Sequence, residues 1–197
     1  MIPLVQSAYY KVSSEIRKWP WESGYWSYRI AKEAHGGHSH EELAYSYQLL
    51  QLYLEMGAPT IGIIPVDLLK KALILKQGLC FSSSERDGGV RFKLESDVIQ
   101  LHPENWDLLD VTNNADAALK MLAFCIDQNG KKYDWPAIFG FKLTCLKEDP
   151  DKWYCTEICD KAKQLVGLWP DFYRSHPSES YWIQKFLTDQ GINYQVI

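Results

Sequence analysis

The sequence lacks the marks of several common classes of protein. Its 21 Lys and Arg residues form no basic run or patch and the net charge is −4, so we do not expect a nucleic-acid partner. No apolar stretch approaches the length of a transmembrane helix. The N-terminus also lacks the basic start and the long apolar run of a signal peptide. We therefore expect a protein that is cytoplasmic when it is made and that has no membrane span.

Cysteine is scarce: the chain has five, which are Cys80, Cys125, Cys145, Cys155 and Cys159. An odd and widely spread set argues against a disulfide framework and indicates reduced thiols. Only Cys155 and Cys159 are close in sequence, so a structural zinc site, which needs a second pair of ligands, is not expected. The chain also has no Gly-rich phosphate loop after a strand and no nucleophile elbow of a serine hydrolase.

Aromatic residues, in contrast, are abundant at 14% of the chain, with 8 Trp and 12 Tyr. Such an excess fits a packed core, a groove for carbohydrate or peptide, or an interface, and it does not choose among them. The charged fraction of 23% and the hydrophobic fraction of 46% are ordinary for a soluble globular protein. Because no repeat, low-complexity tract or linker is visible, residues 1–197 are predicted to form a single domain.

The hydrophobic pattern predicts a mixture of short strands and amphipathic helices, which is an α+β fold. Helices are expected at residues 39–56, where Ser39 and Glu42 have the spacing of a capping box, and at residues 113–128, 155–166 and 179–190. Strands are expected at residues 60–64, 72–75, 79–82, 90–94, 98–101, 107–111 and 192–197.

Cys155 is the most informative single residue. It stands where an extended segment turns into a predicted helix, whose apolar face continues at Ile158, Ala162, Leu165 and Val166. A thiol in the first turn of a helix lies near unpaired N–H groups and the positive end of the macrodipole. Both favour the thiolate, which is the nucleophile. Cys155 is thus a candidate catalytic cysteine, and a small buried hydrophobe is the alternative interpretation.

A cysteine nucleophile needs a base, usually His, and a polar group that orients this base. Three of the five histidines, His35, His38 and His40, lie close together just before Glu41 and Glu42. The cluster can supply the base. With a nearby carboxylate it can also bind zinc or nickel, and a solvated segment without function is the third interpretation.

The segment CFSSSERDGGVR at residues 80–91 is also unusual. Its small hydroxyl residues and glycines allow another group to approach the backbone closely. Arg86 and Arg91 can hold a carboxylate by bidentate hydrogen bonds. We predict Ser83, Arg86 and Arg91, together with Trp153, as substrate-binding residues, and a hairpin with a polar turn is the alternative.

Three segments taken together go further: CFSSSERDGGVR at residues 80–91, YDW at 133–135 and WYCTE at 153–157. In this order they resemble the circularly permuted branch of the NlpC/P60 superfamily of papain-like cysteine peptidases, which has small bacterial and phage members. The resemblance covers roughly residues 70–165. It implies a papain-like α+β fold with a small antiparallel sheet or barrel packed on helices.

The resemblance also implies a nucleophilic Cys155 at the head of a C-terminal helix and a catalytic His on an N-terminal strand. The relatives act on amide or ester bonds in cell-wall peptides or lipids. We therefore expect a cysteine hydrolase that forms an acyl-enzyme on a peptide, a peptidoglycan fragment or a lipid-like substrate. The preferred interpretation includes no cofactor and no metal.

The sequence departs from the family pattern at the histidine. Relatives carry a Ser-His pair on a strand just before the segment that matches residues 80–91, where this chain has Lys70 and Lys71. Either a helical insertion around residues 39–68 separates His40 from its usual neighbours, or the catalytic His has been lost. We predict His40 as the base of Cys155, with Glu42, or alternatively Glu41, as the orienting group.

The alternative function is that of a catalytically inactive papain-like protein with a structural or interaction role, for example as a homo-oligomer or a component of a phage virion. The missing strand histidine and the many aromatic residues favour this alternative.

Overall fold

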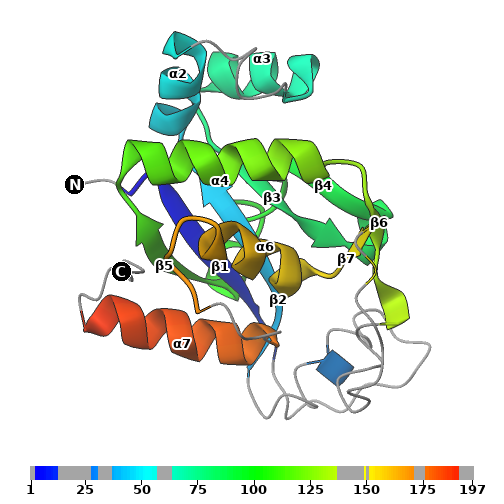
Figure 1. Ribbon diagram of the computed structural model, residues 1–197. Helices are drawn as coiled ribbons and strands as arrows, with labels where there is room; N and C mark the ends of the chain where they lie inside the picture. The colour runs from blue at the N-terminus through cyan, green and yellow to red at the C-terminus, as the bar shows by residue number, and fades with distance from the viewer. Residues whose placement is uncertain are drawn as a thin grey trace.

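The computed structural model describes residues 3–12, 28–30, 37–56, 64–136, 149, 151–170 and 176–190. These residues form an open seven-stranded sheet with the strand order β5-β1-β2-β3-β4-β6-β7. Helices α4, α6 and α7 lie across one face of the sheet, and α2 and α3 lie above them in Figure 1. The predicted α+β class is confirmed, and the described strands form an open sheet rather than a barrel.

The strands of the sheet are short and mostly antiparallel. They are β1 (Val5–Lys11), β2 (His38–Tyr45), β3 (Leu79–Ser84), β4 (Gly89–Leu94), β5 (Trp106–Thr112), β6 (Lys132–Tyr133) and β7 (Lys152–Trp153). Only the pair of β6 and β7 is parallel among the described strands. Gly89 begins β4 with φ at +151°, and a Cβ atom there would collide with the carbonyl oxygen of Lys131. A glycine at this position therefore allows β6 to approach β4.

The helices are α2 (Tyr47–Glu55), α3 (Val66–Leu75), α4 (Ala115–Gln128), α6 (Cys155–Gln164) and α7 (Pro177–Asp189), with short 3₁₀ turns η2 (Glu85–Asp87), η3 (Glu95–Asp97) and η4 (Pro103–Asn105). The main hydrophobic core lies between the sheet and helices α2, α4 and α6, and includes Leu43, Phe81, Leu122 and Ile158. None of the helices that the structure describes is long and apolar enough to cross a membrane.

Several predicted elements are confirmed. Each of them buries one face, and this burial produces the hydrophobic periodicity from which the element is recognised in the sequence. In β4 the side chains of Val90, Phe92 and Leu94 are buried and those between them are not. Helix α4 begins after Asn114, whose side chain accepts a hydrogen bond from the N–H of Ala117 at 3.0 Å. The predicted helices beginning at Cys155 and near residue 179 correspond to α6 and α7, and strand β5 covers the predicted residues 107–111.

Other predictions are wrong. The predicted helix at residues 39–56 is a strand up to Tyr45, and α2 begins only after Ser46, whose hydroxyl accepts from the N–H of Leu49 at 3.3 Å. Both faces of β2 are buried, including polar residues, so no simple alternation is visible in the sequence. Residues 72–75 belong to helix α3, and residues 98–101 form turns after η3. Short apolar runs do not distinguish helix from strand. The predicted strands at 60–64 and 192–197 lie largely or wholly outside the described residues.

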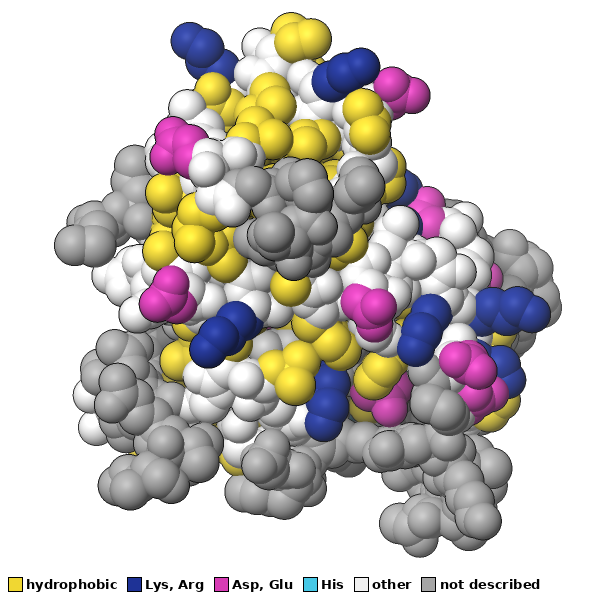
Figure 2. Space-filling view, turned by 45° about the horizontal axis from the view of Figure 1, so that its top comes forward, with side chains coloured by type: hydrophobic (Ala, Val, Ile, Leu, Met, Phe, Trp, Pro, Cys, Tyr) yellow, Lys and Arg dark blue, Asp and Glu magenta, His cyan; other side chains and the backbone are white. Residues whose placement is uncertain are grey.

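Helices α2 and α3 fall between β2 and β3, two strands that are direct neighbours in the sheet. The helical part of the predicted insertion at residues 39–68 thus corresponds to α2 and the start of α3, while residues 38–45 belong to the sheet itself. Hydrophobic side chains gather over this helical pair in Figure 2, and the exposed ones are Leu54, Met56, Val66, Ile74 and Leu75. The predicted homo-oligomer stays a prediction.

A buried polar cluster joins helix α6 to strand β2. The ammonium of Lys163 lies 2.9 Å from Glu41 Oε1 and 2.6 Å from Asp160 Oδ1, and all three side chains are almost completely buried. The same ammonium lies 3.9 Å from the centre of the Trp169 ring. The Ser180 hydroxyl of α7 lies 3.0 Å from both carboxylates. Burial raises the pKa of Asp160, and the charge of Glu41 raises it further, while the charge of Lys163 acts in the opposite direction.

Replacement of Lys163 by Met would leave the carboxyl groups of Glu41 and Asp160 buried without their cation. We expect Lys163→Met to lower the free energy of unfolding by about 3–5 kcal/mol, the usual result of breaking one side of a buried ion pair. Urea unfolding measures this change. Lys161→Met, at an exposed position of the same helix, is the matched control and should change the value by less than about 1 kcal/mol. Equal losses in both variants would show that the cluster does not stabilise the fold.

Candidate active site

Strand β2 carries His40 and Glu42, which are two residues apart and therefore on the same side of the strand. The register of β2 against β1 shifts here: Tyr10 lies opposite His40, while Lys11 lies opposite His38. Ser39 is thus one extra residue in β2. A β-bulge of this kind bends a strand and redirects its side chains, and such bulges are frequent next to active sites. The bulge directly adjoins the predicted base.

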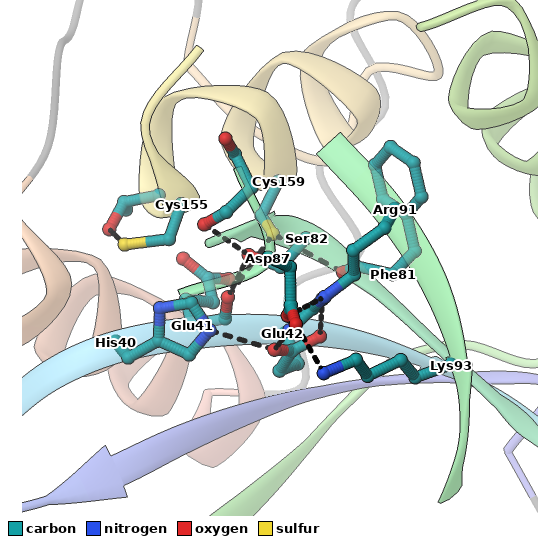
Figure 3. A network of polar contacts seen from close by, with 12 residues as sticks. His40, Glu41, Glu42, Phe81, Ser82, Asp87, Arg91, Lys93, Cys155 and Cys159 are labelled. Atoms are coloured by element: carbon teal, nitrogen blue, oxygen red, sulfur yellow. Dashed lines mark hydrogen bonds and ion pairs between the residues drawn. The ribbon is translucent and has the colours of Figure 1, made fainter. Parts of the chain in front are cut away.

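His40 is held by Glu42. The ring Nε2 donates to Glu42 Oε1 at 2.7 Å, and the Glu42 side chain is completely buried. Arg91, from β4, donates from Nη1 and Nη2 to the two oxygens of Glu42 at 2.7 and 2.6 Å. Its Nε donates to Asp87 at 2.8 Å, and Asp87 in turn pairs with Lys93. Figure 3 shows this chain of alternating charges running from the imidazole across β2 and β4.

The charge of Glu42 follows from these contacts. Burial alone raises the pKa of its carboxyl group, but the charge of Arg91 and the hydrogen bonds from His40 and Arg91 outweigh burial and lower the pKa to about 2. Glu42 is therefore an anion over the whole physiological pH range, with its position fixed by a bidentate partner. An anion at this place orients the imidazole and stabilises its charged form.

The side chain of Cys155 contacts the ring of His40. Cys155 is the first residue of α6, is 3% exposed, and lies beside the His40 ring in Figure 3. Burial alone lowers the pKa of His40, but the charge and hydrogen bond of Cys155, together with those of Glu42, raise it to about 9. Because Nε2 is taken by Glu42, Nδ1 is the ring nitrogen that remains for the sulfur. The structure thus brings together Cys155, His40 and Glu42, the three residues named from the sequence.

The start of α6 is fixed by the strands beside it. Ser83 Oγ donates to the carbonyl oxygen of Trp153 at 2.6 Å, and the N–H of Asp134 donates to the same oxygen at 3.1 Å. The indole of Trp153 donates to Gln128 at 3.1 Å and its ring packs edge-on against Phe124. Ser83 and Trp153, predicted to bind substrate, therefore have a role in the fold: they hold the segment that leads into Cys155.

The predicted substrate-binding arginines differ from each other. Arg86 is exposed in η2, and its predicted role stays a prediction. Arg91 does not fit that role, because three of its donors are already used by Glu42 and Asp87. The sequence could not show this, since the role depends on the pairing of Ser82 with Arg91 in β3 and β4. Glu41, the alternative orienting group, points instead to Lys163 on the helix side of the sheet.

The histidine cluster does not form a metal site among the described residues, where no group of three His, Cys, Asp or Glu side chains is placed to hold an ion. His38 Nε2 lies 2.9 Å from Asp107, and its ring lies against Tyr181 of α7. His35 lies outside the described residues.

Comparison of the chain with protein-family models, with curated proteins and with solved structures gives no match. The function is therefore inferred from the geometry and chemistry of the site.

The contact between Arg91 and Glu42 predicts how stability depends on pH. The pKa of Glu42 is lowered from 4.5 to about 2, so its stabilisation is complete above pH 4.5 and is lost as the pH falls through about 2. In Arg91→Gln the pKa of Glu42 rises, and we expect up to about 3 kcal/mol of this stabilisation to be lost near neutral pH.

Thermal unfolding of Arg91→Gln, followed from neutral pH to about pH 3, checks this expectation. Arg86→Gln, which removes an exposed arginine five residues earlier, is the matched control. An Arg91→Gln variant as stable as Arg86→Gln at every pH would contradict the role given to Arg91.

Proposed function

We propose that this protein is a cysteine hydrolase in which Cys155 is the nucleophile, His40 the proton donor and acceptor, and Glu42 the orienting group. The observation that carries the proposal is the alignment of three side chains: a cysteine that begins a helix, an imidazole beside its sulfur, and a completely buried carboxylate 2.7 Å from the far ring nitrogen. Covalent catalysis uses the same three groups: a nucleophile, a base, and a polar group that orients the base.

The resting site would hold a charged imidazole at neutral pH, because the pKa of His40 is about 9. A cation beside a cysteine favours the thiolate. The thiolate attacks the carbonyl carbon of an ester or amide, and an S–C bond forms while the carbonyl oxygen takes the negative charge. Backbone N–H groups in the first turn of α6, which have no partner within the helix, would stabilise this oxyanion.

The intermediate then expels its leaving group, which takes the proton from His40, and a thioester with Cys155 remains. Neutral His40 next accepts a proton from water as that water attacks the thioester carbonyl. The acid product leaves, and the thiolate and the charged imidazole form again. Glu42 stays ionised throughout and holds the ring in one orientation.

The order of the elements and the resemblance support a papain-like, permuted NlpC/P60 assignment. The histidine comes from β2 and the cysteine from α6 near the other end of the chain, as the permuted order requires. On this basis the substrate is a cell-wall peptide or a lipid-like ester. An inactive fold with a structural role, for example in a phage particle, is the second candidate, and the low exposure of the Cys155 residue, 3%, favours it.

Site-resolved alkylation by iodoacetamide from about pH 5 to pH 9 separates the two candidates. If Cys155 is the nucleophile, it reacts near pH 6 at least about 10-fold faster than Cys80, Cys125 and Cys159. Burial raises the pKa of those three thiols. We expect His40→Ala to slow the reaction of Cys155 by about 10-fold or more.

His102→Ala is the control for this experiment, since His102 is exposed and far along the chain from the site. It should leave the alkylation of Cys155 as it is in the unmodified protein. If Cys155 reacts no faster than the buried thiols, or if His40→Ala has no more effect than His102→Ala, the hydrolase proposal fails and the structural candidate is favoured.

A further inference from the structure

An aromatic row continues from His40 across the sheet. Tyr10 of β1 lies directly opposite His40 of β2 and also directly opposite Trp106 of β5. Residues directly opposite one another on neighbouring strands point to the same face of a sheet. The three rings therefore lie in sequence on the face that carries the predicted base.

The distances show that the Trp106 ring contacts each of the other two rings. The centroids of Tyr10 and Trp106 are 5.2 Å apart, and those of His40 and Trp106 are 6.3 Å apart, both in edge-to-face arrangements. Trp106 packs against a small cluster that contains Ala8, Ala44 and other buried residues, which fixes its place. Tyr10 and Trp106 are both only partly buried, so each keeps ring surface accessible.

The chemistry of the proposed reaction indicates which part of a substrate would meet these rings. The leaving group must reach His40, because it takes its proton from the imidazole, whereas the acyl group stays on the sulfur. Surfaces that extend from His40 toward β5 therefore face the leaving group. Both side chains in this part of the row, Tyr10 and Trp106, are aromatic, and such rings bind planar apolar groups edge-on or stacked.

We propose that Tyr10 and Trp106 form the leaving-group subsite of this enzyme, and that the subsite takes an uncharged group with a planar ring. This inference rests on the proposed hydrolase function. It differs from a shielding role for Trp106, in which the indole would only keep water from the bond between His40 and Glu42. A shield would change the reaction with every substrate by the same factor.

A pair of acetate esters separates these possibilities. Phenyl acetate and 2,2,2-trifluoroethyl acetate transfer the same acetyl group to Cys155, with formation of the S–C bond and loss of phenol or trifluoroethanol. The measured quantity is the ratio of the two acetylation rates, followed by mass spectrometry of Cys155 and compared with the ratio for N-acetylcysteine. We expect the ratio in the protein to exceed that of N-acetylcysteine by about 10-fold, the size of one good aromatic contact.

The variants Trp106→Leu and Tyr10→Leu keep an apolar side chain for packing and remove the ring. Each should bring the ratio toward the value for N-acetylcysteine. Trp182→Leu is the matched control, because Trp182 is 61% exposed on α7, and it should keep the ratio. The subsite would be overturned if the rate ratio of the unmodified protein equalled that of N-acetylcysteine. It would also be overturned if Trp106→Leu did not change the rate ratio.

A binding measurement keeps this test separate from the hydrolase proposal. In Cys155→Ala no acyl transfer occurs, and phenol can be titrated while the indole resonance of Trp106 is followed by NMR. We expect phenol, but not trifluoroethanol, to shift this resonance, with no comparable shift at Trp182. If Cys155 accepts no acetyl group but phenol binds, the hydrolase proposal fails and the aromatic site stands. If phenol shifts both indoles alike, the aromatic site is wrong.

Discussion

The site depends on one constraint, the attachment of helix α6 to strand β2 by the ion pair of Lys163 and Glu41. Cys155 begins that helix, and His40 and Glu42 lie on that strand, so their alignment requires the two elements to keep one position. Glu41 stands between His40 and Glu42 in sequence and points to the opposite side of the sheet. The strand thus carries a structural carboxylate on one side and a predicted catalytic pair on the other.

A hydrophobic contact in place of this ion pair could stabilise the fold equally well, since the desolvation of two charges offsets much of their attraction. What the ion pair adds is a fixed register. A carboxylate that must meet an ammonium at 2.9 Å does not permit the helix to slide along the strand, whereas apolar side chains can repack with small shifts. For a sulfur that must face one ring nitrogen, a shift of about 1 Å is enough to slow catalysis strongly.

The second buried carboxylate, Glu42, has a different purpose in this account. Arg91 keeps it ionised, and its charge supports the charged state of His40. Two unit charges about 4 Å apart attract by about 4 kcal/mol where the effective dielectric constant is near 20. Glu42 thereby adds to the larger effect of Cys155, and together they raise the pKa of His40 to about 9 although burial opposes it.

The sequence predicted the elements that form because of a local hydrophobic pattern. Helix α4, helix α6 and strand β4 each have one buried face, so their patterns of Leu, Ile, Val and Phe could be recognised. Strand β2 is buried on both sides and carries His40, Glu41 and Glu42 in its interior, and this gave the wrong prediction of a helix. The chemistry of a cysteine at a helix start selected Cys155, and the family resemblance then led to His40 and Glu42. The catalytic role of all three stays a prediction.

The contacts that hold the site could not be predicted from the sequence, because they join residues that are far apart along the chain. Lys163 and Glu41 are 122 residues apart, and Arg91 and Glu42 are 49 residues apart. The sequence alone predicts that Arg91 binds substrate, because an arginine in a polar segment has no visible partner there. Only the register of β2, β3 and β4 shows that its partner is a buried carboxylate.

The central claim is that Cys155 and His40 act as one charged pair, and an NMR titration of the His40 imidazole tests it most directly. The account predicts a pKa of about 9 in the unmodified protein and a lower value in Cys155→Ala, since the charge and hydrogen bond of Cys155 are removed. Cys125→Ala, which removes a buried thiol bonded to Tyr45 instead, should leave the value near 9. A pKa close to the ordinary 6.5 in the unmodified protein, or the same value in Cys155→Ala, would contradict the account.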